Sequence, residues 1–371
     1  MAALQNCRKA LYAWTALVAF AAPCAAQIDP KTALLERAGW EALTAGRAHA
    51  AAEAFRDAIA ADPKNARLHL GAGMAATLER RDADALDAVQ RALALDPRLV
   101  EARALLGQIQ YRLGDAAAAI RTYEGLVAAA PDDRGAQATL ARWQREAALH
   151  DRMRQAIGAN FTVSFEGPAE EALASEALAS LDRAYWRIGQ LLGTYPSAPI
   201  PVVLYSSEQF HDITRSPAWA AGAYDGIIRV PMGGALDKRG ELDRVLAHEF
   251  AHALVRSLAT AGVPAWLNEG LASALETGDL EWAQSVLAAQ ARTGRPGPSL
   301  RALPSGFGRL TGDQAALVYA VSAVAVRRLL DEAGGFAMAN LLRDLGAGVN
   351  FDEAFLHRMQ RSFADFQNSL P

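Results

Sequence analysis

The chain has 371 residues, of which 51% are hydrophobic and 21% are charged, and its formal net charge is −4. This length allows two or three domains, and the composition supplies enough apolar residues for packed cores. Nothing in it resembles the strongly basic surface of a nucleic-acid-binding protein, so no nucleic-acid partner is expected.

The N-terminus has the three parts of a secretory signal peptide. A short positive region precedes an uncharged apolar run from residue 10 to about residue 22, and small residues follow up to Ala26. The run is shorter than the about 20 residues that a transmembrane helix needs. Cleavage after Ala26 would remove residues 1–26 and leave no stable membrane span. The expected location is the periplasm of a bacterium or the medium. An uncleaved anchor and a lipid-modified Cys24 are the alternatives.

Both cysteines, Cys7 and Cys24, lie within this N-terminal segment. The mature chain would therefore contain no disulfide, and packing alone would stabilise it. It would also lack thiolate ligands, so any metal site must use histidine and carboxylate side chains.

Residues 32–134 contain a pattern that repeats every 34 residues, in four columns. The columns are Gly39, Gly73 and Gly107; Ala51, Ala85 and Ala119; Phe55, Val89 and Tyr123; and Pro63, Pro97 and Pro131. The small residues mark where two helices approach closely, and the large ones fill the space between neighbouring units. Proline ends the second helix of each unit, because it cannot occupy a helix interior. The pattern predicts pairs of antiparallel helices.

These columns resemble the tetratricopeptide repeat (TPR) family. The resemblance implies an all-α repeat domain over residues 27–150, with about three units and a capping helix that extends over residues 136–156. It also implies a module that binds a protein or peptide partner. Two positions depart from the family pattern, since His69 and Arg103 stand where the family prefers an aromatic or large apolar residue.

Residues 151–371 show short strand patterns first and helical patterns afterwards. The predicted strands are residues 160–167, 199–207 and 226–231, and the predicted helices are residues 169–193, 237–262, 265–278 and the segment after residue 311. A Pro/Gly-rich loop interrupts the helices at residues 292–308. This order predicts an α+β domain with a small sheet.

The stretch VLAHEFAHALV places His248, Glu249 and His252 in an apolar run that predicts a helix. Residues four apart share a helix face, so the two imidazoles can bind one metal ion, and Glu249 can reach a water bound to it. A catalytic zinc site needs a third protein ligand. Glu269, in the next predicted helix, is the candidate. The alternative is two buried structural histidines and a surface carboxylate.

At this point the chain resembles the gluzincin (MA-type) zinc metallopeptidases, over about residues 160–368. Their pattern is H-E-x-x-H on one helix and N-E-x-x-A, or a close variant, on the next. The matching residues here are His248, Glu249, His252, Asn268, Glu269 and Ala272. The resemblance implies an α+β metallopeptidase domain that hydrolyses peptide bonds.

The resemblance also implies the roles of these residues. His248, His252 and Glu269 would bind Zn2+, and Glu249 would be the general base. A donor to the developing oxyanion often comes from a later helix of these enzymes, which makes Tyr319 a candidate. An ordinary core position is the alternative for that tyrosine. The strand at residues 226–231 is expected at the sheet edge, where gluzincins pair with extended substrate.

The sequence thus predicts an exported zinc metallopeptidase whose TPR module recruits a protein substrate or partner. All the groups needed for chemistry are expected in the second domain, and the cleft is expected to lie wholly within it. The rival hypothesis is a TPR scaffold of an envelope complex with a catalytically inactive peptidase-like domain. Glu249 argues against that rival, because a purely structural zinc site has no need of a base.

Overall fold

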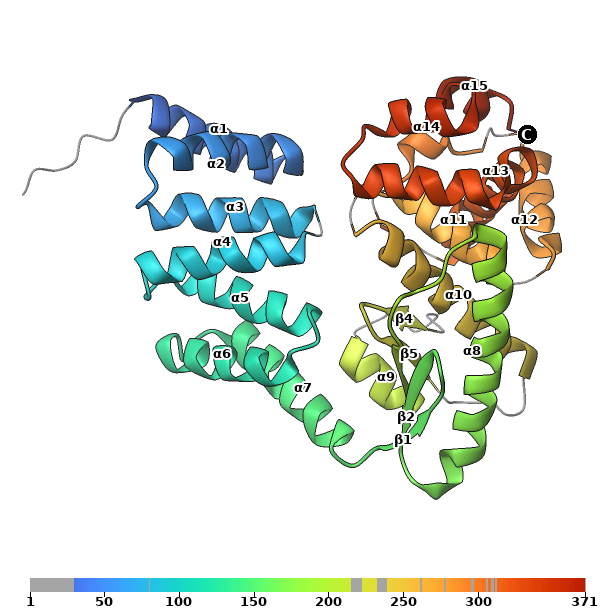
Figure 1. Ribbon diagram of the computed structural model, residues 1–371, viewed down its shortest axis with the longest axis horizontal. Coiled ribbons are helices and arrows are strands. Elements are labelled where there is room, and N and C mark those ends of the chain that lie inside the picture. Colours follow the sequence, from blue (N-terminus) through green and yellow to red (C-terminus); the bar gives the residue numbers. More distant parts are fainter. Residues whose placement is uncertain are drawn as a thin grey trace, which may run out of the picture.

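The computed structural model describes residues 30–79, 81–214, 222–231, 239–260, 262–276, 278–294, 297–304, 306–307, 310 and 312–370. The predicted signal peptide lies outside these ranges. The chain forms a stack of helices beside a body of helices and strands, and α7 (Arg134–His150) leads from one to the other (Figure 1). Among the helices in the described ranges, none combines the length and apolar character that a membrane crossing requires.

The helix pairs of the stack have the close packing that the repeat pattern predicts. Besides α7, its helices are α1 (Pro30–Thr44), α2 (Ala48–Ala61), α3 (Ala66–Leu78), α4 (Asp82–Leu95), α5 (Val100–Arg112) and α6 (Ala116–Ala129). A Cβ on Gly73 would lie only 2.5 Å from the Val89 side chain, so only glycine fits there. The equivalent pairs are Gly39 with Phe55 and Gly107 with Tyr123. The alanine column is completely buried. The predicted role of these columns is confirmed.

His69 and Arg103, the two departures from the TPR pattern, contact the proline column. A side-chain nitrogen of each lies near the carbonyl oxygen of the proline six residues earlier, at 2.9 Å and 2.7 Å. Gln137 donates to the equivalent proline carbonyl over 2.6 Å. A polar residue at this column therefore satisfies a carbonyl group in the turn between units.

The capping helix ends earlier than predicted. The sequence pattern predicts helix up to residue 156, but α7 ends at His150, and residues Arg154–Ile157 form β1. β1 pairs antiparallel with β2 (Phe161–Phe165), so sheet pairing overrides the local helical pattern there. The predicted boundary between residues 150 and 151 stays a prediction, because α7 packs on both parts of the chain.

The second part contains a five-stranded sheet in the order β1-β2-β3-β5-β4. β3 (Ile200–Tyr205) and β5 (Ile228–Pro231) continue the parallel pairing that begins at β2, and β1 and β4 (Ala223–Tyr224) are antiparallel edges. The expectation that the strand at residues 226–231 lies at the edge is wrong, because the short β4 pairs with its outer side.

Helices cover both faces of this sheet. α8 (Glu171–Leu192) and α10 (Arg239–Leu258) pack on one face, and α9 (Ser207–Thr214) with the end of α7 covers the other. Side chains of β3 alternate between the two layers: Val202 and Leu204 belong to the main core, whereas Tyr205 packs with α9. A helical layer follows, consisting of α11 (Ala265–Glu276), α12 (Glu281–Arg292), α13 (Gly312–Gly346), α14 (Phe351–Met359) and α15 (Phe363–Asn368). The predicted class, TPR repeats followed by an α+β domain, is confirmed.

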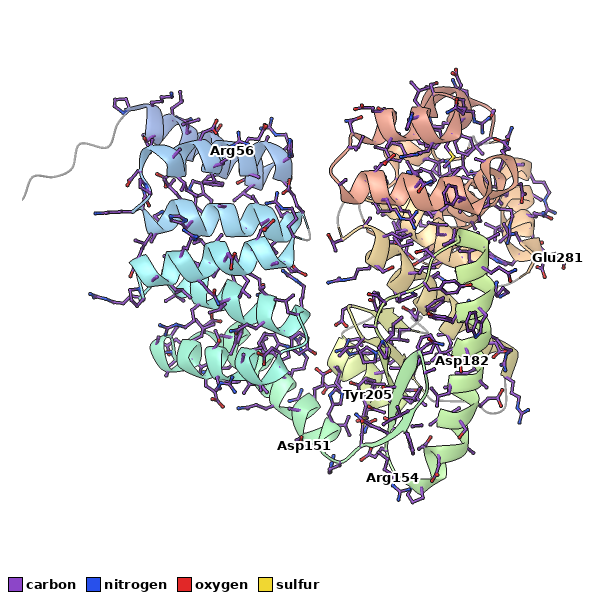
Figure 2. All side chains as sticks on the ribbon, viewed as in Figure 1. Arg56, Asp151, Arg154, Asp182, Tyr205 and Glu281 are labelled. Carbon is purple, nitrogen blue, oxygen red and sulfur yellow. The ribbon has the colours of Figure 1, made fainter. Side chains whose placement is uncertain are left out.

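A buried ion pair joins the repeat stack to the sheet. Glu146 of α7 accepts hydrogen bonds from Arg229 of β5 over 3.1 Å, from Tyr205 over 3.3 Å, and from Tyr111 of α5. Glu146 and Arg229 are only 4% and 3% exposed. Figure 2 shows Tyr205 near Asp151, which follows the end of α7. Buried polar contacts therefore connect the two parts in addition to the chain itself.

Candidate metal centre

The histidines of the motif lie on the face of α10 that is turned away from the sheet. Leu246, Phe250 and Leu254, four residues apart, form the buried face of the helix in the main core. His248 and His252 are offset from them by two residues, so they lie on nearly the opposite face, and both line a cleft. The local helix pattern therefore fixes the direction of both imidazoles.

α11 brings Glu269 to these histidines. Gly262, with a φ of +82°, provides the turn after α10, and α11 begins directly after Pro264. On the opposite side of α11, Gly270 packs against α13 so closely that a Cβ there would lie 2.5 Å from the carbonyl oxygen of Ser322. This contact holds α11 between α10 and α13.

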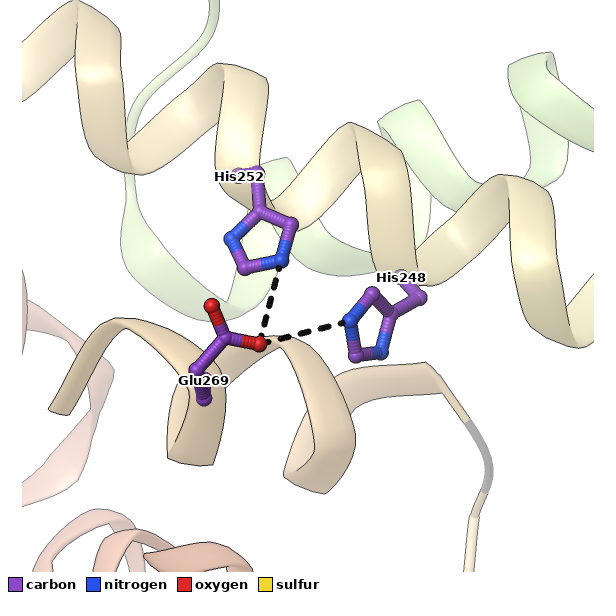
Figure 3. A group of neighbouring side chains, drawn as sticks. All are labelled: His248, His252 and Glu269. Atoms are coloured by element: carbon purple, nitrogen blue, oxygen red, sulfur yellow. Dashed lines mark ion pairs between the residues drawn. The ribbon is translucent and has the colours of Figure 1, made fainter. Parts of the chain in front are cut away.

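The three predicted ligands point toward one another (Figure 3). Oε2 of Glu269 lies 3.6 Å from Nε2 of His252 and 3.9 Å from Nε2 of His248. One donor atom from each residue falls within 4.8 Å of the other two. Donors at 2.0–2.2 Å around a tetrahedral zinc ion would lie about 3.3–3.5 Å apart, so the two distances from Glu269 need only slight contraction to fit one.

Glu276 contacts the ring of His248 at Nδ1, on the edge away from the other predicted ligands. Its Oε2 lies 2.7 Å from Nδ1 of His248, and its Oε1 accepts a hydrogen bond from Nη1 of Arg244 over 3.2 Å. A carboxylate at Nδ1 favours the tautomer in which Nε2 has a free lone pair for a metal. The sequence reasoning missed Glu276. The available signal was its position two helical turns after Glu269, which places it on the same face of α11.

Glu249 lies beside this group and is only 5% exposed. Burial raises its pKa to about 7; the neighbouring imidazole of His252 opposes the shift, and the carboxylates of Glu269 and Glu276 add to it. Its Oε2 is buried and makes no hydrogen bond within the described ranges. The same holds for Nδ1 of His252. Nε2 of His252 faces Glu269, so its unpaired Nδ1 is on the other edge of the ring; the unpaired Oε2 of Glu249 is the atom that indicates a partner the protein itself does not supply.

Tyr319 of α13 lines the same cleft and faces Glu269. Burial raises the pKa of the Tyr319 hydroxyl, and its hydrogen bond to the negatively charged Glu269 adds to the effect. The ring stacks edge-on against Phe307, with the centroids 5.2 Å apart. The structure thus brings Tyr319, the candidate that the family resemblance implies, to the predicted ligands. The carboxylate of Glu269 thus holds the Tyr319 hydroxyl beside the three predicted ligands.

The cleft around these residues has a volume of about 1100 Å³. It follows α10 from Arg244 past both histidines to Thr260, and its lining includes Leu78 of α3. The expectation that the cleft lies wholly within the second domain is therefore wrong. The repeats supply part of its wall, and the 34-residue pattern gave no indication of this, because Leu78 belongs to none of the four columns.

Family models match both parts of the chain. Tetratricopeptide repeat models match residues 37–100 and 76–143, and a Peptidase MA superfamily model matches residues 180–363. The chain therefore has a Peptidase MA superfamily domain that is preceded by tetratricopeptide repeats. The gluzincin pattern of H-E-x-x-H and Glu269 is a finer assignment within that superfamily.

Known proteins similar to this chain include the Hsp70-Hsp90 organizing protein of Triticum aestivum, 35% identical over 131 residues. That match covers 35% of this chain but only 22% of the relative. Among solved structures, the first TPR of Spaghetti (RPAP3) bound to an HSP90 peptide is 22% identical, with a TM-score of 0.31, over 32% of this chain and 96% of that one. The crystal structure of MamA is 25% identical, with a TM-score of 0.32, over 33% and 72%.

Proposed function

We propose that this chain is an exported zinc-dependent metallopeptidase whose TPR module recruits a protein substrate or partner. The convergence of His248, His252 and Glu269 in one cleft, with Glu249 buried beside them, is the observation that carries the proposal. The Peptidase MA superfamily domain supports the reaction class. The repeats, and the likeness to a chaperone-organizing protein, support a protein or peptide as the recruited ligand.

The residues present fit a zinc ion. They offer two imidazole nitrogens and one carboxylate oxygen, the set typical of a catalytic zinc with one open position. When bound, zinc lowers the pKa of a water molecule and polarises the carbonyl that is attacked. Glu276 fixes the ring of His248, and Arg244 in turn holds Glu276. The protein therefore provides both the ligands and the groups that orient them.

Glu249 is the proposed general base. A cation held by its neighbours favours the ionised carboxylate, which opposes the effect of burial on its pKa. In that state its unpaired Oε2 can take a proton from water and later pass it to the leaving amine. Tyr319 is the proposed donor to the developing oxyanion, because its hydroxyl lies at Glu269 in the same cleft.

Two variants test this proposal. Purified protein is expected to contain one zinc per chain by elemental analysis, and Glu269→Ala should lose it, since only three protein ligands are available. Glu249→Gln should keep zinc and fold but hydrolyse a generic peptide about 10²–10⁴-fold more slowly. Glu281→Gln, an exposed carboxylate at the start of α12, is the matched control.

Equal rates for wild type and Glu249→Gln would reject the mechanism. Absence of both zinc and hydrolysis would instead favour the scaffold.

Export rests on the N-terminal pattern, and mass spectrometry of the mature N-terminus tests it. A chain that begins at Gln27 is expected, whereas an intact N-terminus on protein in the envelope would support a membrane anchor.

A further inference from the structure

One additional column of the 34-residue repeat faces the second part of the chain. It contains Leu78 and Arg112, the last residues of α3 and α5, and Glu146, near the end of the capping helix α7. Glu146 binds Arg229 of the sheet, and Arg112 binds the buried Asp82 over 2.7 Å. The Glu146 contact joins the column to the peptidase domain, whereas Asp82 belongs to α4 of the repeats. Leu78, the third member, lines its cleft.

Asp82 connects this column to the metal-binding helix. Besides Arg112, it accepts a hydrogen bond from Arg256 of α10 over 3.3 Å. Arg256 follows His252 by one helical turn and itself lines the cleft. The contact holds the turn between α3 and α4 beside α10, so Leu78 has a fixed position next to the metal centre.

The end of the cleft at Leu78 combines apolar side chains with Thr260 and with Arg256, whose guanidinium is paired with Asp82. Leu78 is 54% exposed, so most of its side chain is available to a molecule in the cleft. The side chains that line the cleft with it after His252 include Val255, Ala259 and Val263. This apolar surface is continuous with the metal centre, since all of these residues border one cleft. A peptide that extends along the cleft from the histidines toward Leu78 would cover this surface.

We infer that the repeats build one end of the substrate cleft, and that this end takes a large apolar side chain of the peptide. The inference rests on the proposed peptidase function, since the occupant is its substrate. The contact geometry makes the TPR module part of the catalytic unit, beyond its recruiting role. Specificity at one substrate position is then set by a side chain of the repeats.

The test uses the full chain and a panel of labelled six-residue peptides, each with Ala, Leu, Phe, Glu or Lys at one scanned position. Binding to zinc-loaded Glu249→Gln protein is measured by fluorescence anisotropy, and cleavage is measured with an intact Glu249. Both are repeated with Leu78→Ala and Leu78→Glu. Leu113→Glu is the control, because Leu113 is an exposed leucine one unit later and lies outside the cleft.

The unsubstituted cleft should prefer Leu or Phe at one scanned position. Leu78→Ala should reduce that preference about threefold to tenfold, and Leu78→Glu should abolish it or replace it with a preference for Lys. Other positions, and the Leu113→Glu protein, should keep the original profile. An unchanged profile in Leu78→Glu, or the same change in Leu113→Glu, would overturn the inference, as would an absence of peptide binding.

The two proposals fail separately. If wild type and Glu249→Gln cleave at the same rate, the mechanism is rejected, but the binding profile still decides the role of Leu78. If cleavage depends on Glu249 but substitutions at Leu78 do not change the peptide preference, the proposed peptidase function is retained. The inference that the repeats contribute to the substrate cleft is then rejected.

Discussion

Replacing Glu146 by alanine should destabilise the protein strongly, because it leaves the buried guanidinium of Arg229 without its buried partner. Arg229 is 3% exposed, and the one acidic partner that it would retain among the residues that the structure describes is Asp225, which is half exposed. Breaking a buried ion pair by removing one partner costs about 3–5 kcal/mol. The Tyr111 hydroxyl also loses its acceptor, whereas Tyr205 keeps a contact with His150 at 2.7 Å. We therefore expect a loss of about 3–5 kcal/mol.

Urea denaturation followed by circular dichroism measures this loss. The matched control is Asp212→Ala, which removes a second contact between α7 and the peptidase domain. Asp212 pairs with Arg145 at 3.0 Å, but both side chains are more than half exposed, so about 0–1 kcal/mol is expected. A Glu146→Ala loss below about 1 kcal/mol, or one equal to that of the control, would refute the idea that burial makes this junction strong.

Three further predictions concern the metal centre and the junction. Glu276→Gln should weaken zinc binding about 10–100-fold in competition with a chelator, and unchanged affinity would remove Glu276 from the support of the site. Gly222→Ala should keep zinc but slow peptide hydrolysis at least about tenfold, because its Cβ would lie 2.5 Å from Oε1 of Glu249; wild-type rates would show that Glu249 can move freely. Burial lowers the pKa of His150 below its ordinary 6.5, so the unfolded chain binds the proton more readily. Stability should therefore be full above about pH 6.5 and fall below it. The test is the fall in melting temperature below pH 6.5, which should be smaller for His150→Gln than for wild type or for the exposed control His357→Gln. An equal fall in all three proteins would contradict this.

The parts of the fold that the sequence predicts are those that local periodicity controls. The repeat columns predict the contact of Gly73 with Val89, because helix pairs of fixed length repeat the same packing. The spacing of His248 and His252 predicts a shared helix face. Glu269 required a further step, since its approach depends on the turn at Gly262, which the sequence also indicates.

The features that sequence reasoning missed depend on contacts between different elements of the fold. Glu276 reaches His248 only because α10 and α11 lie side by side. Residues 154–156 leave the helical pattern because β2 offers them a pairing edge. The place of Leu78 in the cleft depends on how the whole stack is oriented on the peptidase domain. No periodic pattern in either part encodes such an orientation.

The column at Leu78, Arg112 and Glu146 also fixes how many repeats separate its two contacts with the peptidase domain, and therefore where repeats can be added. The sheet contacts one end of the column through Glu146, and α10 contacts the other end, two repeats away, through Asp82. The number of repeats between these two contacts is therefore fixed by the distance between the sheet and the end of α10. Units added before α1 would lengthen the free end and leave both anchor points in register. A unit inserted between α4 and α5 would carry Leu78 and Asp82 one step past α10. Growth of this repeat array is therefore permitted in one direction only.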